Sequence, residues 1–233
     1  MSDGTDDASP HTVFDEWATD GRDRGMEEGH WGTAKQVIAR LPIEDGDRVL
    51  DLGTGSGYAA RAMRDLKEAG RAYGLDGAPT MARNARSYTD DPNVGYVLGD
   101  FGALPFADDA IDHVFSMEAL YYASDPHETL ADLHRVIRPG GAFYCAVDYY
   151  EESIHTHEWD EYVDAPMTRW SRAKYRQAFR EAGFHVAEQD TVPDRDVDIP
   201  PASEFPTEEW DSREAMIDRY RTHGTLLTVG VVP

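Results

Sequence analysis

The chain has 233 residues, which suits a single α/β domain with one core. Its 22 Lys and Arg against 45 Asp and Glu give a formal net charge of −23, which disfavours nucleic-acid backbones and anionic lipid as partners. No apolar run reaches the ~18 residues of a membrane helix, and the first residues lack a basic or apolar signal region, so we expect no membrane association and a cytoplasmic location.

The acidic residues are spread over the whole chain, whereas lysine occurs only three times. An even acidic coat keeps a surface solvated in strong salt, so the composition indicates a halophile. The single cysteine, Cys145, lies in an apolar run and is expected to be a buried packing thiol in a reducing compartment.

The first part of the chain is predicted to cover the domain rather than to build its sheet. Residues 1–11 are polar and acidic and are expected to be a disordered tail. Residues 12–45 are expected to form a cap of two helices, the first capped by Thr12, joined by a link that contains three glycines.

A glycine-rich stretch at residues 48–58, RVLDLGTGSGY, is the centre of the sequence. Its apolar start predicts a buried strand, and Gly53, Gly55 and Gly57 predict a turn that lets a ligand approach the backbone. The apolar spacing that follows, from Ala59 to Leu66, predicts an amphipathic helix whose first N–H groups face the ligand.

Strands and helices then alternate to the end of the chain. Further strands are predicted at residues 71–75, 94–98, 111–117, 141–147, 184–188 and 226–232. Residues 148–170 and 190–210 break the alternation and are expected to be insertions near the substrate side; Ser171 and Asp211 are the predicted caps of the last two helices. Alternating elements imply a mainly parallel, doubly wound α/β sheet, so residues 12–233 are expected to be one domain.

Three acidic residues follow the first three strands, where ligands of such sheets bind. Asp76 lies where a carboxylate can accept two hydrogen bonds from a ribose diol, and Asp100 with Phe101 offers an acceptor for an exocyclic amine beside an aromatic ring. A dinucleotide site would need glycine in place of Tyr58, while Asp51 before the turn suits a ligand that carries a cation.

These motifs resemble class I S-adenosylmethionine-dependent methyltransferases, in particular the small-molecule branch that includes the quinone-ring enzymes. The resemblance rests on residues 49–57, Asp76, residues 99–101, the strand approach at 108–117 and residues 138–141. It implies a Rossmann-like seven-stranded sheet of order 3-2-1-4-5-7-6 with the last strand antiparallel. S-adenosylmethionine is the implied cofactor, and S-adenosylhomocysteine the product.

The resemblance also implies a set of cofactor contacts. In it, the glycine turn admits the methionine moiety, Asp51 reaches toward the ammonium group, and Asp76 holds both ribose hydroxyls. Gly77 and Met81 are implied to flank the adenine, and Asp100 with Phe101 to contact its edge. Met117 and Glu118 are implied to lie near the ammonium group. The full set is Asp51, Gly53, Thr54, Gly55, Gly57, Asp76, Gly77, Met81, Asp100, Phe101, Met117 and Glu118.

Methyl transfer from a sulfonium is an in-line displacement that needs proximity and a dry pocket more than a dedicated side chain. The candidates for removing an acceptor proton are His30, Tyr122, Asp148 and His155. The run from His155 to Asp160 has metal-binding residue types, but a solvated loop explains it, so no metal is predicted.

A small-molecule acceptor is the leading prediction. A macromolecule methyltransferase and a cofactor-binding regulator without turnover are the alternatives. Residues 116–119 read Ser-Met-Glu-Ala, and not the Asn/Asp-Pro-Pro-Tyr/Phe motif that methylation of base or glutamine nitrogens favours. The acceptor atom and the choice between monomer and homodimer stay open.

Overall fold

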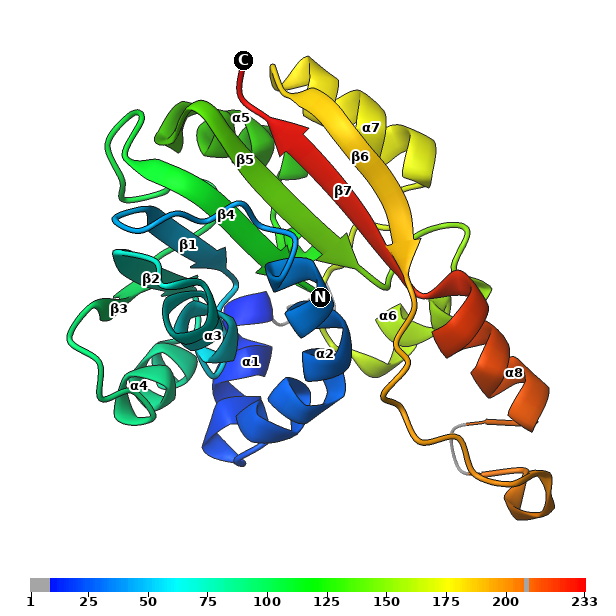
Figure 1. Ribbon diagram of the computed structural model, residues 1–233. Coiled ribbons are helices and arrows are strands. Elements are labelled where there is room, and N and C mark those ends of the chain that lie inside the picture. The colour runs from blue at the N-terminus through cyan, green and yellow to red at the C-terminus, as the bar shows by residue number, and fades with distance from the viewer. Residues whose placement is uncertain (1–8, 208–209) are drawn as a thin grey trace, which may run out of the picture.

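The computed structural model describes residues 9–207 and 210–233. Its centre is one seven-stranded sheet of order β3-β2-β1-β4-β5-β7-β6 (Figure 1). Strands β1 to β5 are parallel to one another, and β7 is antiparallel to both β5 and β6. The predicted fold class and strand order are therefore confirmed.

The strands lie close to their predicted positions, except that the sixth continues to Val192 and so takes up the first residues of the insertion predicted at 190–210. They are β1 (Arg48–Leu52), β2 (Arg71–Asp76), β3 (Val94–Leu98), β4 (Ile111–Met117), β5 (Ile137–Val147), β6 (His185–Val192) and β7 (Thr225–Val231). The fifth strand begins four residues before the predicted Gly141, because Ile137 pairs with Ile111 and a register shift follows before Ala142 pairs with His113. β4 is buried along its whole length, as a central strand of a covered sheet should be.

Helices cover both faces of the sheet. They are α1 (Pro10–Thr19), α2 (Asp23–Ile38), α3 (Tyr58–Lys67), α4 (Pro79–Ser87), α5 (Pro126–Val136), α6 (Trp159–Tyr162), α7 (Arg172–Glu181) and α8 (Arg213–Ile217). Neighbouring residues of β5 alternate between the faces: Phe143 belongs to the core under α5 and α7, whereas Tyr144 belongs to the core under α2 and α3. Among the described residues, no helix is both long and apolar enough to cross a bilayer.

The N-terminal cover differs from the prediction in two places. Helix α1 begins at Pro10 and not at Thr12, because Ser9 accepts a hydrogen bond from the Thr12 amide and proline suits the first helical turn. The expected disordered tail was thus wrong for residues 9–11, and residues 1–8 lie outside the described part. The glycine-containing link is also mostly helical, since α2 already begins at Asp23.

The C-terminal segment before β7 holds a second difference. Ser212, and not Asp211, caps α8 by accepting a hydrogen bond from the Ala215 amide. The helix then widens into a π-helical segment, η4 (Asp218–His223), which the apolar periodicity did not predict. This segment lies beside the loop that follows β5, which carries the short helices η2 (Ile154–Thr156) and α6 (Figure 1).

Candidate active site

One cavity lies at the carboxyl ends of β1, β2 and β4, and α1 and α2 close it from the other side. Eleven of the twelve predicted cofactor contacts line it, the exception being Gly57. The other lining residues come mainly from the helical cover and the segment after β4. They are Ser9, Pro10, His11, Phe14, Asp23, Met26, Glu27, His30, Ser56, Tyr58, Ala78, Ala119, Tyr122, Ala123 and Ser124.

Gly53 and Gly57 are needed in the turn for two different structural reasons. Gly53 has a φ of +75°, and a Cβ there would collide with the Ala119 side chain, so glycine keeps the cavity floor open. Gly57 has a φ of +82° at the start of α3, and its missing side chain makes room for the Tyr96 ring. Gly57 therefore supports packing behind the turn and does not face the cavity.

Asp51 is almost fully buried at the end of β1. Its Oδ2 accepts a hydrogen bond of 2.6 Å from Thr54 Oγ1. Burial outweighs this bond and raises the pKa of Asp51 to about 7. A cation placed beside Asp51 would favour the ionised carboxylate, so this residue can sense the charge of a ligand.

Asp76 joins the glycine turn to the end of β2. Its Oδ2 accepts from the Gly55 amide at 2.8 Å, and its Oδ1 accepts from the Ala78 amide at 2.9 Å. Burial raises the pKa of Asp76 despite these bonds. Because a carboxylate has about four lone-pair positions, both oxygens can accept further hydrogen bonds from a ligand diol in the cavity.

Asp100 is held at the outer rim of the cavity. Its Oδ1 accepts from the Gly102 amide at 2.7 Å, and its Oδ2 accepts from His11 Nε2 at 2.9 Å. The His11 ring also packs against Gly77, where a Cβ would meet it. His11 could not be predicted as a site residue, because it stands in the stretch expected to be disordered.

Glu118 directly follows β4 and adopts a φ of +54°, which is uncommon for a residue other than glycine. Its Oε2 accepts a 2.7 Å hydrogen bond from Tyr121 Oη, and its Oε1 accepts from the Asp148 amide. Burial, followed by the nearby charge of Asp148, raises the pKa of Glu118 well above its usual value. Two fixed donors thus hold an unusually placed carboxyl group at the cavity wall.

A buried ion pair lies behind this wall. Asp148 Oδ2 pairs with Arg219 Nη2, and the two side chains are 12% and 5% exposed. Among the described residues, Asp148 Oδ1 is buried without a hydrogen-bond partner. His30 lines the cavity nearby; burial lowers its pKa, while the charge of Asp148 raises it and that of Arg219 lowers it.

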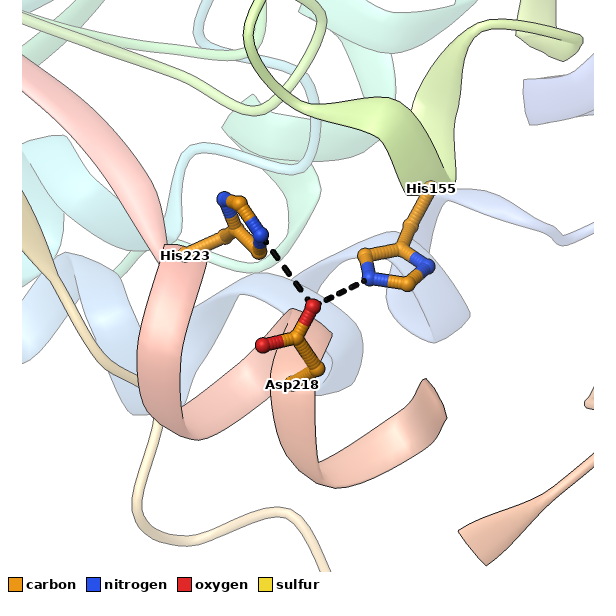
Figure 2. A group of neighbouring side chains, drawn as sticks. All are labelled: His155, Asp218 and His223. Carbon is orange, nitrogen blue, oxygen red and sulfur yellow. Dashed lines mark hydrogen bonds and ion pairs between the residues drawn. The ribbon is translucent and has the colours of Figure 1, made fainter. Parts of the chain in front are cut away.

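The four candidate catalytic residues therefore separate. His30 and Tyr122 line the cavity, and Asp148 lies in the ion pair behind it. His155 is instead grouped with Asp218 and His223 (Figure 2). Arg219 could not be predicted as a site residue, because no motif lies near it in the chain. Only the fold brings it next to Asp148.

Comparison with known proteins agrees with this geometry. Residues 50–145 match the family described as a methyltransferase domain. The chain is 63% identical to a chain in a solved complex between the Haloferax volcanii Trm112 methyltransferase activator and a candidate methyltransferase. The match covers 94% of this chain and 97% of that one, with a TM-score of 0.93. The chain belongs to the class I S-adenosylmethionine-dependent methyltransferases. S-adenosylmethionine is accordingly its cofactor, and the buried carboxylates and open glycine turn of the cavity fit it.

Curated relatives of this methyltransferase are longer proteins. A sterol 24-C-methyltransferase from Schizosaccharomyces pombe is 29% identical over 169 residues, which cover 67% of this chain and 44% of that protein. An arsenite methyltransferase from Halobacterium salinarum is 35% identical over 126 residues, or 52% of this chain and 31% of that protein. The chain thus spans less than half the length of these relatives. The two haloarchaeal relatives agree with the acidic composition.

Proposed function

We propose that this chain transfers a methyl group from S-adenosylmethionine to a small-molecule acceptor that binds between Glu118 and His30. The observation that carries the proposal is the enclosed part of the cavity beyond Glu118, which His30 lines together with the apolar side chains Phe14 and Tyr122.

The proposed cofactor contacts follow from the geometry of the strand ends. Asp76 accepts hydrogen bonds from the ribose hydroxyls with the lone pairs that Gly55 and Ala78 leave free. Asp51 balances the ammonium charge from below the turn. Asp100 and Phe101 meet the adenine edge, so His11 would have to share or release Asp100 when adenine is bound.

The bound cofactor supplies an electrophilic methyl group on a positively charged sulfur. The chain's own residues then have to orient the acceptor, exclude water and take up a proton. His30 suits the last task, because burial lowers its pKa and leaves it neutral at pH 7. Tyr122 and Phe14 lie edge-to-face at a centroid distance of 4.9 Å and supply an apolar part of the lining.

A macromolecular acceptor is the second candidate function. It is favoured by the 63% identity to a protein solved in complex with Trm112, which is described as a methyltransferase activator. We propose on the same ground that this chain binds a Trm112-like protein partner. Co-expression of the two proteins with a tag on the partner alone tests this: retention of the chain in strong salt supports the complex, and its loss with the folded partner present contradicts it.

The acceptor class is tested with methyl-labelled S-adenosylmethionine and a size-fractionated extract of a halophile, in concentrated KCl. Label in the small-molecule fraction is expected. Label found only in protein or RNA would establish the second candidate instead. Tight cofactor binding without any transfer, in the presence of the partner, would indicate a regulator. A reaction with Asp76→Ala protein serves as the control for transfer by contaminating enzymes.

A further inference from the structure

A separate side-chain cluster joins two distant parts of the chain. His155 comes from η2, in the loop after β5, whereas Asp218 and His223 come from η4 (Figure 2). His155 Nε2 and His223 Nε2 lie 3.0 and 3.1 Å from the same carboxylate oxygen, Asp218 Oδ2. The three possible ligand atoms all lie within 4.8 Å of one another.

The π-helical form of η4 is what brings two of these side chains together. Asp218 and His223 are five residues apart, and the helix closes with a hydrogen bond from the Gly224 amide to the Arg219 carbonyl, also five residues apart. In an α-helix, residues three or four apart share a face. π-Helical turns are rare and occur frequently at functional sites, so this local widening calls for a reason.

The donor set is that of a transition metal site. Two imidazoles and one carboxylate are a common three-ligand set for Zn²⁺ that leaves a fourth position to water. Bonds of about 2.0–2.1 Å in a tetrahedron place neighbouring ligand atoms roughly 3.4 Å apart. The two distances from Asp218 Oδ2 to the histidine nitrogens, 3.0 and 3.1 Å, are a few tenths of an ångström shorter than this, so a small withdrawal of the carboxylate would lengthen both to the spacing of a metal site.

The surroundings also suit a bound cation. The His155 side chain is only 15% exposed, and the Trp210 ring lies 5.9 Å from its ring. The net charge of −23 raises the local concentration of cations around the whole protein. Imidazole ligands favour zinc over magnesium or calcium.

We propose that His155, Asp218 and His223 bind one Zn²⁺ ion and that this ion clamps η4 to the loop after β5. Arg219 directly follows Asp218 and forms the buried pair with Asp148. The clamp therefore fixes the segment that presents Arg219 to the acceptor side of the active site. The ion would hold the two segments together from outside the cavity that the cofactor contacts line, so this inference stands apart from the proposed function.

The first test measures metal binding by the whole protein. Protein stripped with a chelator is dialysed against Zn²⁺ in concentrated KCl, and the metal content and thermal midpoint are then measured. One Zn²⁺ per chain and a raised midpoint are expected, and Mg²⁺ should produce neither. Co²⁺ in the same site should show the absorption bands of tetrahedral coordination. A parent protein that retains no Zn²⁺ and shows no shift would overturn the proposal.

Variants then assign the ligands. His155→Ala and His223→Ala should each weaken Zn²⁺ binding by more than the about 10- to 100-fold that loss of an outer-shell partner costs, because each removes a direct ligand. His157→Ala is the matched control, because His157 is two residues from His155 but contacts the Glu151 carbonyl instead. Binding that survives in both ligand variants, or that is lost equally in the control, contradicts the assignment. Circular dichroism establishes that each variant is folded, and Asp218→Asn provides a third, less disruptive ligand change.

Discussion

The two sides of the active site are built in different ways. The predicted cofactor contacts lie mostly in a stretch of about fifty residues, from Asp51 to Phe101, at or just after the carboxyl ends of parallel strands, and Met117 and Glu118 at the end of β4 complete them. On the proposed acceptor side, His30 and Glu118 line the cavity and the Asp148–Arg219 pair lies behind it, so these groups come from four separate parts of the chain. The first side therefore depends on successive β-α units that are close in the sequence, whereas the second forms only when the whole domain has folded.

The two sides also differ in how their charged side chains are held in place. On the cofactor side, backbone amides hold the carboxylates and leave lone pairs free. On the acceptor side, charges hold one another, and one carboxylate oxygen has no partner among the described residues. Changes on the first side should thus alter cofactor affinity with little loss of stability, and changes on the second should alter turnover and stability together.

Removing His30 should give the largest effect on turnover. Loss of a general base costs about 10²- to 10⁴-fold in rate, so His30→Ala should lower kcat by that range while cofactor affinity changes little. The label-transfer assay measures the rate, and calorimetry measures affinity. His30→Gln, which retains volume and a polar end, is the matched variant. Full activity in both variants would remove His30 from the reaction.

Breaking the buried ion pair should give the largest effect on stability. Arg219→Met leaves Asp148 charged and unpaired, and such losses cost about 3–5 kcal/mol of unfolding free energy. Denaturant unfolding measures this value. The double variant Arg219→Met with Asp148→Asn should recover most of it, because no uncompensated charge remains. Equal stability of single and double variants would show that the pair does not carry this energy.

Removing Asp76 should act on the other side of the site. Charge-assisted hydrogen bonds contribute about 1.5–3 kcal/mol each, so Asp76→Ala should weaken S-adenosylmethionine binding by one or more decades. Calorimetry compares it with Asp76→Asn, which keeps the shape and one acceptor oxygen. Unchanged affinity in Asp76→Ala would remove this residue from the cofactor site. Preferential binding of NAD by the parent protein would contradict the assignment of S-adenosylmethionine as the cofactor.

The pH dependence of cofactor binding should give the smallest effect. Asp51 has a pKa of about 7, so below that pH the free protein holds a growing fraction of neutral Asp51. Because a cationic ligand prefers the ionised form, affinity should rise by up to about tenfold per pH unit as pH approaches 7 and level off above it. Asp51→Asn should abolish this slope. A flat profile in the parent would show that the ligand charge does not reach Asp51.

Asp51 should have the opposite effect of pH on the folding stability of the protein without cofactor. Its folded-state pKa lies above the unfolded value of 3.8, so the folded state binds more protons between these values. This contribution to stability is complete below the unfolded pKa and is lost as pH rises through about 7. Unfolding at a series of pH values, compared between the parent and Asp51→Asn, measures it.

The sequence predicted the sheet and the cofactor side because both depend on local patterns. Strand and helix periods, the glycine turn and the strand-end acids each occupy a few consecutive residues, and the carboxyl ends of parallel strands meet at one edge whatever the loops do. Even there, the role of Gly57 required the structure, since only packing shows that Tyr96 and not a ligand fills the space beside it.

The tertiary structure alone decided the rest. His11 and Arg219 carry no local mark, and their partners Asp100 and Asp148 lie 89 and 71 residues away in the chain. The π-helical turn at Asp218–His223 departs from regular helix geometry and packs against the loop after β5. The spacing of apolar residues does not predict it. Local periodicity by itself predicted the strand ends where the cofactor is proposed to bind, but the pairing of Asp148 with Arg219 was decided by the tertiary structure, because such pairs form only when distant segments are brought together.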